Sequence, residues 1–163
     1  MTDIAIQPHT EADRNDVVAG IIDLQEVERA MADTRMPGIE VADAYVEQLL
    51  KWIRERSGKI FVAKDKNRFV GFVACGIEHH ETVAETLDSN TYGYIVDAYV
   101  VPESRGKGVF KMLNAKAEEF LIQSDVVKLI RITVLAKNDA ALRAYERVGY
   151  VPEEFILMKR VKK

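Results

Sequence analysis

Residues 94–110 read YIVDAYVVPESRGKGVF. The first half is rich in β-branched and aromatic residues and ends at Pro102, which is typical of a strand. The second half predicts a glycine-rich, basic loop that opens a helix near Gly108. The first backbone N–H groups of a helix are unpaired and carry partial positive charge, and Arg105 and Lys107 add full charges. The segment therefore predicts a phosphate site, with a tight strand-to-helix turn carrying solvated cations as the alternative.

The segment downstream extends this pattern. The helix after Gly108 is predicted to place its apolar residues on one face, namely Val109, Met112, Leu113, Ala117, Phe120 and Leu121. A strand over 127–135 follows, and Asn138 is a suitable N-cap for a second helix that ends at Gly149. A strand, a helix and a second strand over 93–135 predict a parallel, right-handed unit.

The upstream half supplies helices and a hairpin. We expect a short first strand at Ile4 and Ile6, a helix over about 11–33 in one or two pieces, and a helix over about 42–56. Two β-rich runs, 59–64 and 68–77, predict a hairpin, and a strand over 93–101 follows the polar loop 78–91. A final strand is expected over 155–161. The fold class is α+β (mixed α/β), with helices covering a mixed sheet.

The composition restricts the class of protein. The chain has 163 residues, which predicts a single domain over 1–163, and its net charge of −3 argues against a nucleic-acid-binding surface. No apolar run is long enough to span a bilayer and the N-terminus is not a secretory signal, so we expect no membrane partner and a cytoplasmic location. Cys75, the one cysteine, is expected to be a small buried apolar residue, and no metal-ligand spacing occurs.

Two motifs in this order resemble the GNAT family of N-acetyltransferases. The family carries [RQ]-x-x-G-x-[GA] at a strand-to-helix turn, and this chain has Arg105-Gly106-Lys107-Gly108-Val109-Phe110. The family also carries an Asn that opens a helix, then a Tyr, then Gly and an aromatic residue; here these are Asn138, Tyr145, Gly149 and Tyr150. The departure is Phe110, where the family has Gly or Ala, and this side chain either crowds a bound diphosphate or packs elsewhere. The resemblance implies a central mixed sheet of about six to seven strands flanked by about four helices.

The resemblance also implies acetyl-CoA as co-substrate, with no metal. Backbone groups of Tyr99, Val100 and Val101 would pair with its pantetheine arm, and Asn138 would touch the same region. Amides of Arg105, Gly106, Lys107, Gly108, Val109 and Phe110 would hold its diphosphate. Tyr145 would donate a hydrogen bond to the cofactor sulfur and protonate the departing thiolate. A phenol with a pKa near 10 is protonated at neutral pH and can serve as this donor. From the residues alone, a core aromatic beside Leu142 and Val148 is the favoured interpretation of Tyr145.

An attacking amine is mostly protonated at neutral pH and needs a base. Asp97 interrupts an apolar strand, and Glu78, His79 and His80 follow the hairpin. A buried carboxyl group without a task is costly, yet alternate residues of a strand face opposite sides, so Asp97 can also face solvent. The two histidines adjoin acids in a loop, where a solvated role is the favoured interpretation of both.

The leading hypothesis is therefore an N-acetyltransferase that moves an acetyl group from acetyl-CoA to a primary amine, of a small molecule or a protein, by direct attack. A non-catalytic acyl-CoA-binding or sensing module is the alternative, and a structural domain that pairs through its sheet edge is a third reading. Loops 33–42 and 78–92 are expected to form the acceptor pocket. The acids of the second loop suit a cationic acceptor, and a homodimer is one option for the assembly.

Overall fold

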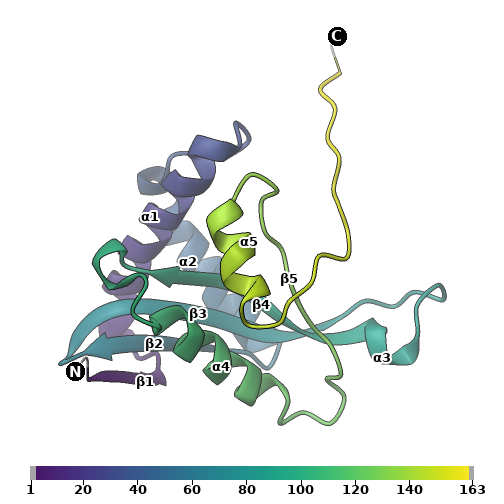
Figure 1. Ribbon diagram of the computed structural model, residues 1–163, viewed down its shortest axis with the longest axis horizontal. Coiled ribbons are helices and arrows are strands. Elements are labelled where there is room, and N and C mark those ends of the chain that lie inside the picture. Colours follow the sequence, from purple (N-terminus) through teal and green to yellow (C-terminus); the bar gives the residue numbers. More distant parts are fainter. Residues whose placement is uncertain (1–2, 162–163) are drawn as a thin grey trace.

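The computed structural model describes residues 3–161 and contains a five-stranded mixed sheet (Figure 1). Its strands lie in sequence order: β1 (Ile4–Pro8), β2 (Lys59–Asp65), β3 (Arg68–His79), β4 (Thr91–Val100) and β5 (Ile130–Ile132). The first three pairings are antiparallel, and β4 and β5 are parallel. The predicted mixed fold is confirmed, although the described residues form five strands where six to seven were expected.

Helices cover both faces of this sheet. α1 (Arg14–Met31) and α2 (Gly38–Glu55) pack on one face, where Val17, Val46 and Phe72 belong to one buried cluster. α4 (Val109–Leu121) packs on the other face, where Leu113 and Ile95 belong to a second cluster. The remaining elements are α5 (Asp139–Glu146), the short α3 (Leu87–Asn90), and the 3₁₀ turns η1 (Glu11–Asp13) and η2 (Pro102–Ser104). Over residues 3–161, no helix combines the length and apolar character needed to cross a bilayer.

A β-bulge in β4 decides which face Asp97 occupies. Cys75 pairs with Ile95, whereas the preceding residue Ala74 pairs with Asp97, so Val96 is an extra residue in β4. Ile95 is buried on the α4 face. Without the bulge, Asp97 would share that face with Ile95. The extra residue instead turns Asp97 towards α2.

β4 and β5 diverge after a short pairing. Only Gly93–Ile95 pairs with Ile130–Ile132, although β4 continues to Val100. The expected strand over 127–135 is therefore reduced to three residues. The second half of β4 consequently has a free backbone edge on the side away from β3, next to the loop that leads into α4.

The expected last strand is wrong. Residues 151–161 form no strand, and in Figure 1 they run away from the sheet as an extended segment. The residues satisfy the composition of a strand, but a strand also needs a partner for its backbone groups. The side chains of this segment are exposed, and they include Phe155, Ile156, Leu157 and Met158.

The boundary between α1 and α2 also differs from the expectation. The second helix was expected over about 42–56, but Pro37 is the N-cap of α2, which begins four residues earlier than expected. Proline is well tolerated at the start of a helix because its missing N–H has no intrahelical partner there. The loop between the helices is correspondingly short.

Candidate active site

The loop before α4 is built around two glycines with left-handed backbone. Gly106 has φ +74° and Gly108, the N-cap of α4, has φ +83°. A Cβ at either position would meet nothing within 4 Å, so the backbone conformation is what requires glycine. Both glycines and Lys107 are exposed, and the N–H groups of the first α4 turn lack intrahelical acceptors. This arrangement suits an anion.

Arg105 is held back towards the sheet. Its Nε donates to the Val100 carbonyl at 3.0 Å, while buried Ser104 anchors the loop through its own N–H, which donates to the Val101 carbonyl at 2.9 Å. The Arg105 side chain thus connects the loop to the free end of β4. Lys107 is the cation that projects from the loop.

The free edge of β4 presents Val100 rather than its neighbours. The Val101 N–H donates to Val70 on β3 at 3.0 Å, and its carbonyl accepts from Ser104, so Val101 has no free backbone group. Tyr99 shares the backbone direction of Val101, because successive residues of a strand point to opposite sides. The N–H of Val100 faces the free side. Of the three predicted backbone partners, Val100 is the one that the geometry leaves accessible.

Tyr145 lies beside Phe110, the residue that departs from the family motif. It is 7% exposed, and its ring meets Phe110 edge-on at 4.9 Å and Tyr150 at 5.4 Å between centroids. Phe110 therefore packs against Tyr145. Burial, the charge of Asp97 and the hydroxyl of Tyr94 all raise the pKa of Tyr145, so its phenol is protonated at neutral pH. Asn138 caps α5, its side chain accepting from the Ala141 N–H at 3.1 Å.

Asp97 is half-buried between the sheet and α2. Its Oδ2 accepts from the Tyr45 hydroxyl at 2.8 Å. Burial raises the pKa of Asp97 to about 6, the hydrogen bond from Tyr45 opposes this increase, and the charge of Glu28 adds to it. A carboxyl group with this pKa is ionised at neutral pH but close enough to it to accept a proton.

Glu78 lies at the far end of β3 and is bound on both oxygens. Oε1 accepts from the Trp52 indole at 2.8 Å, and Oε2 accepts from Arg56 at 2.9 Å. These contacts give Glu78 a structural role that its sequence context did not reveal. His79 and His80 are exposed, and His79 lies within 2.7 Å of the Thr91 hydroxyl. Across residues 3–161, no cluster of three His, Cys, Asp or Glu side chains could hold a metal ion.

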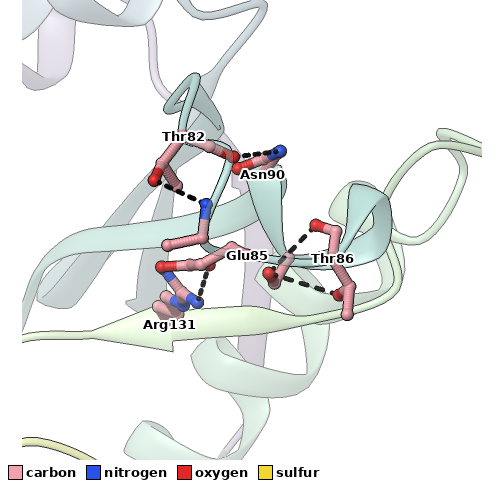
Figure 2. A network of polar contacts seen from close by, with 7 residues as sticks. Thr82, Glu85, Thr86, Asn90 and Arg131 are labelled. Carbon is pink, nitrogen blue, oxygen red and sulfur yellow. Dashed lines mark hydrogen bonds and ion pairs between the residues drawn. The ribbon is translucent and has the colours of Figure 1, made fainter.

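The loop between β3 and β4 is tied to β5 (Figure 2). Arg131 donates to Glu85 at 3.1 Å, and its guanidinium lies 4.5 Å from the centre of the Tyr92 ring. Within the loop, the Asn90 side chain donates to the Thr82 carbonyl at 3.2 Å. Arg131 therefore neutralises one of the acids that we had associated with a cationic acceptor, and Arg56 neutralises Glu78.

The other predicted acceptor loop borders a surface hollow of about 470 Å³ at the end of α1. Its lining includes Asp33, Arg35 and Pro37 from the turn before α2. Arg35 donates to Glu28 at 2.7 Å. This ion pair links the lining of the hollow to Glu28, the carboxylate whose charge raises the pKa of Asp97. Sequence reasoning missed both Tyr45 and Glu28, because on the sequence each belongs to an ordinary amphipathic helix.

Comparison with known proteins identifies the family. Residues 12–150 match the acetyltransferase (GNAT) family. N-alpha-acetyltransferase 30 of Schizosaccharomyces pombe is 30% identical over 90 residues, 55% of this chain and 55% of that protein, so the match spans about half the length of this curated relative.

Two solved proteins share the fold. A GCN5-related N-acetyltransferase from Ralstonia eutropha JMP134 superposes with a TM-score of 0.74 at 16% identity, covering 96% of this chain and 98% of the other. The aminoglycoside N-acetyltransferase AAC(6')-Iy in complex with CoA gives 0.69 at 14% identity, covering 100% and 97%. The same enzyme with the bisubstrate analogue CoA-S-monomethyl-acetylneamine gives 0.68 at 14% identity, covering 99% and 100%.

Proposed function

The chain belongs to the acetyltransferase (GNAT) family, and on this premise we propose that it transfers the acetyl group of acetyl-CoA to a primary amine by direct attack. One observation carries the proposal: Asp97 lies in the half of β4 that does not pair with β5, and its charge raises the pKa of the Tyr145 phenol. One is an ionised carboxylate and the other a protonated phenol. These are the groups needed to take a proton from an amine and to give one to a thiolate.

The phosphate end of acetyl-CoA would bind at the start of α4. The left-handed Gly106 and Gly108 let the backbone approach an anion, and Lys107 adds a charge. The structures of AAC(6')-Iy with CoA and with its bisubstrate analogue support CoA as the ligand of this fold. The pantetheine arm would follow the free edge of β4, where Val100 offers its N–H.

The chain's residues can account for each proton. Asp97 would accept a proton from the acceptor amine, whose nitrogen then forms a bond to the acetyl carbon as the bond from that carbon to sulfur breaks. The Val100 N–H, which points away from β3, would donate to the carbonyl oxygen as that oxygen gains charge. Tyr145 would donate its proton to the sulfur and regain one from solvent. Glu78, with both oxygens already occupied, is not needed in this scheme.

The acceptor class is supported only as an amine. The S. pombe relative is named as an N-alpha-acetyltransferase, and the bisubstrate analogue of AAC(6')-Iy contains acetylneamine. The arginines bound to Glu78 and Glu85 reduce the negative charge of the loop after β3. We therefore propose a primary amine without assigning it a further positive charge.

The test is CoA release from acetyl-CoA with a panel of amines, for the wild-type chain and Tyr145→Phe. We expect turnover on at least one amine, and a loss of about 10²–10⁴-fold in kcat for the variant with little change in CoA affinity. Tight CoA binding without turnover on any amine would favour an acyl-CoA-sensing module instead. Equal turnover by both chains would remove Tyr145 from the role of acid.

A further inference from the structure

The side chain of Tyr45 on α2 contacts Asp97, the proposed base, on β4. It lies in the middle of α2, half-buried against the cluster that contains Val46 and Phe72. Its hydroxyl donates to Asp97 Oδ2 at 2.8 Å, joining two residues that are 52 positions apart in the sequence. The ring of Tyr45 accounts for its packing against this cluster, but not for its hydroxyl. The polar end of Tyr45 therefore serves a purpose that packing alone does not explain.

The surroundings of Asp97 contain few other charges. From α1, Glu28 acts on it and is itself paired with Arg35. From α5, the phenol of Tyr145 is neutral, and the charge of Asp97 contributes to its raised pKa; Tyr94 on β4 donates its own hydroxyl to Thr133 at 3.0 Å. The residue opposite Asp97 on β3 is alanine. Tyr45 thus donates the hydrogen bond that orients the carboxylate.

We propose that Tyr45 is a positioning residue for Asp97, and that its hydrogen bond holds the carboxylate in one orientation and favours the ionised form. The role of Asp97 as base rests on the proposed function; the action of Tyr45 on Asp97 does not. A hydrogen bond donated to a carboxylate stabilises the charged form, whereas a nearby negative charge destabilises it. Through this hydrogen bond, α2 influences the ionisation of a group on β4.

The proposal is tested in Tyr45→Phe, and the direction in which the Glu28 charge shifts the pKa of Asp97 supplies a second variant with the opposite expected change. In Tyr45→Phe, which preserves the ring, the acidic limb of the kcat/KM profile moves to higher pH by about one unit, because hydrogen bonds to charged groups have about this strength. In Glu28→Gln, the limb moves to lower pH, since the loss of one negative charge leaves Arg35 close by. Tyr92→Phe, on the same strand but under Arg131, is the matched control and leaves the limb in place.

A second measurement does not depend on turnover. Carbon-detected NMR of the aspartate carboxyl groups in the unliganded chain follows the titration of Asp97 directly, with Asp97→Asn to assign its signal. We expect the same order: Tyr45→Phe above wild type, and wild type above Glu28→Gln. If no amine is acetylated but this order holds, the proposed function fails while the action of Tyr45 stands. An Asp97 titration that is identical in wild type and Tyr45→Phe overturns the inference, whatever the activity.

Discussion

Asp97 weakens the fold that holds it. Its pKa in the folded chain is raised from the ordinary 3.8 to about 6, because burial disfavours the charged form. Between these two pH values the folded chain binds more protons than the unfolded chain, so stability falls as pH rises through this window and stays lower above it. Such a cost is typical of a group retained for its chemistry.

Replacing Asp97 by Asn should therefore separate stability from activity. The amide still accepts the hydrogen bond of Tyr45 but carries no charge. We expect Asp97→Asn to be more stable than wild type at pH 8 by up to about 3 kcal/mol, and equally stable at pH 3.5, while kcat falls by about 10²-fold or more. Urea unfolding at both pH values, together with the acetylation assay, measures this. A variant that is less stable than wild type at pH 8 would contradict the burial of a charge at this position.

The structure also shows where the side chain of Phe110 packs. Since its ring meets Tyr145 edge-on at 4.9 Å, it packs beside the proposed acid. We expect Phe110→Ala to lose a contact of about 0.5–1.5 kcal/mol and to lower kcat several-fold through a less ordered Tyr145. CoA affinity, measured by calorimetry, should change less than threefold. A tenfold gain in affinity would show instead that Phe110 crowds the diphosphate.

The candidate site residues were named from local sequence, whereas their partners could not be. The glycine loop and the N-cap Asn138 are local signals, and Tyr145 was named through the family resemblance. Whether Asp97 faces the core depended on the extra residue Val96, and a bulge leaves no mark in a run of apolar residues. Glu78 was an equal candidate on the sequence because its partners, Trp52 and Arg56, come from a different element.

At the scale of elements, the sharpest prediction concerns the turn between β4 and α4. Gly108→Asp places a carboxylate and a strained backbone at the N-terminus of α4, where the diphosphate is proposed to bind. We expect CoA affinity to fall at least tenfold. Gly149→Asp is the matched control: Gly149 also has positive φ, +102°, with open space around it, but follows α5. CoA affinity equal to wild type in Gly108→Asp would exclude this loop as the phosphate site.

Elements with a strong period were predicted well, and elements that depend on a partner were not. The apolar face of α4 and the hairpin of β2 and β3 are encoded locally, so their ranges agree with the structure to within a few residues. β5 is shorter than its apolar run because β4 diverges from it, which no local pattern shows. The strand expected over 155–161 has suitable residues but no neighbour in the described chain.

At the scale of the molecule, two buried clusters on either side of the sheet carry the fold. Cys75 shows that these clusters exclude solvent: its side chain is fully buried, and burial raises the pKa of its thiol to about 12. Residues 151–161 lie outside both clusters. Among the described contacts, an ion pair joins this segment to the rest of the chain: Arg160 lies 2.7 Å from Asp33, and both side chains are largely exposed. Exposed pairs of this kind contribute about 0–1 kcal/mol.

The last prediction concerns this C-terminal segment. Because Phe155 and Leu157 are 80% and 93% exposed, charged replacements there remove no buried contact. We expect the double variant Phe155→Glu/Leu157→Glu to unfold within about 0.5 kcal/mol of wild type and to bind CoA equally well. Its tendency to associate, followed by sedimentation at rising concentration, should fall, since contiguous exposed apolar side chains favour association. Leu113→Ala, in the cluster under α4, is the contrasting control and should cost about 2–5 kcal/mol. A comparable loss in the double variant would mean that these side chains are packed in solution, and residues 155–161 would then be the missing strand.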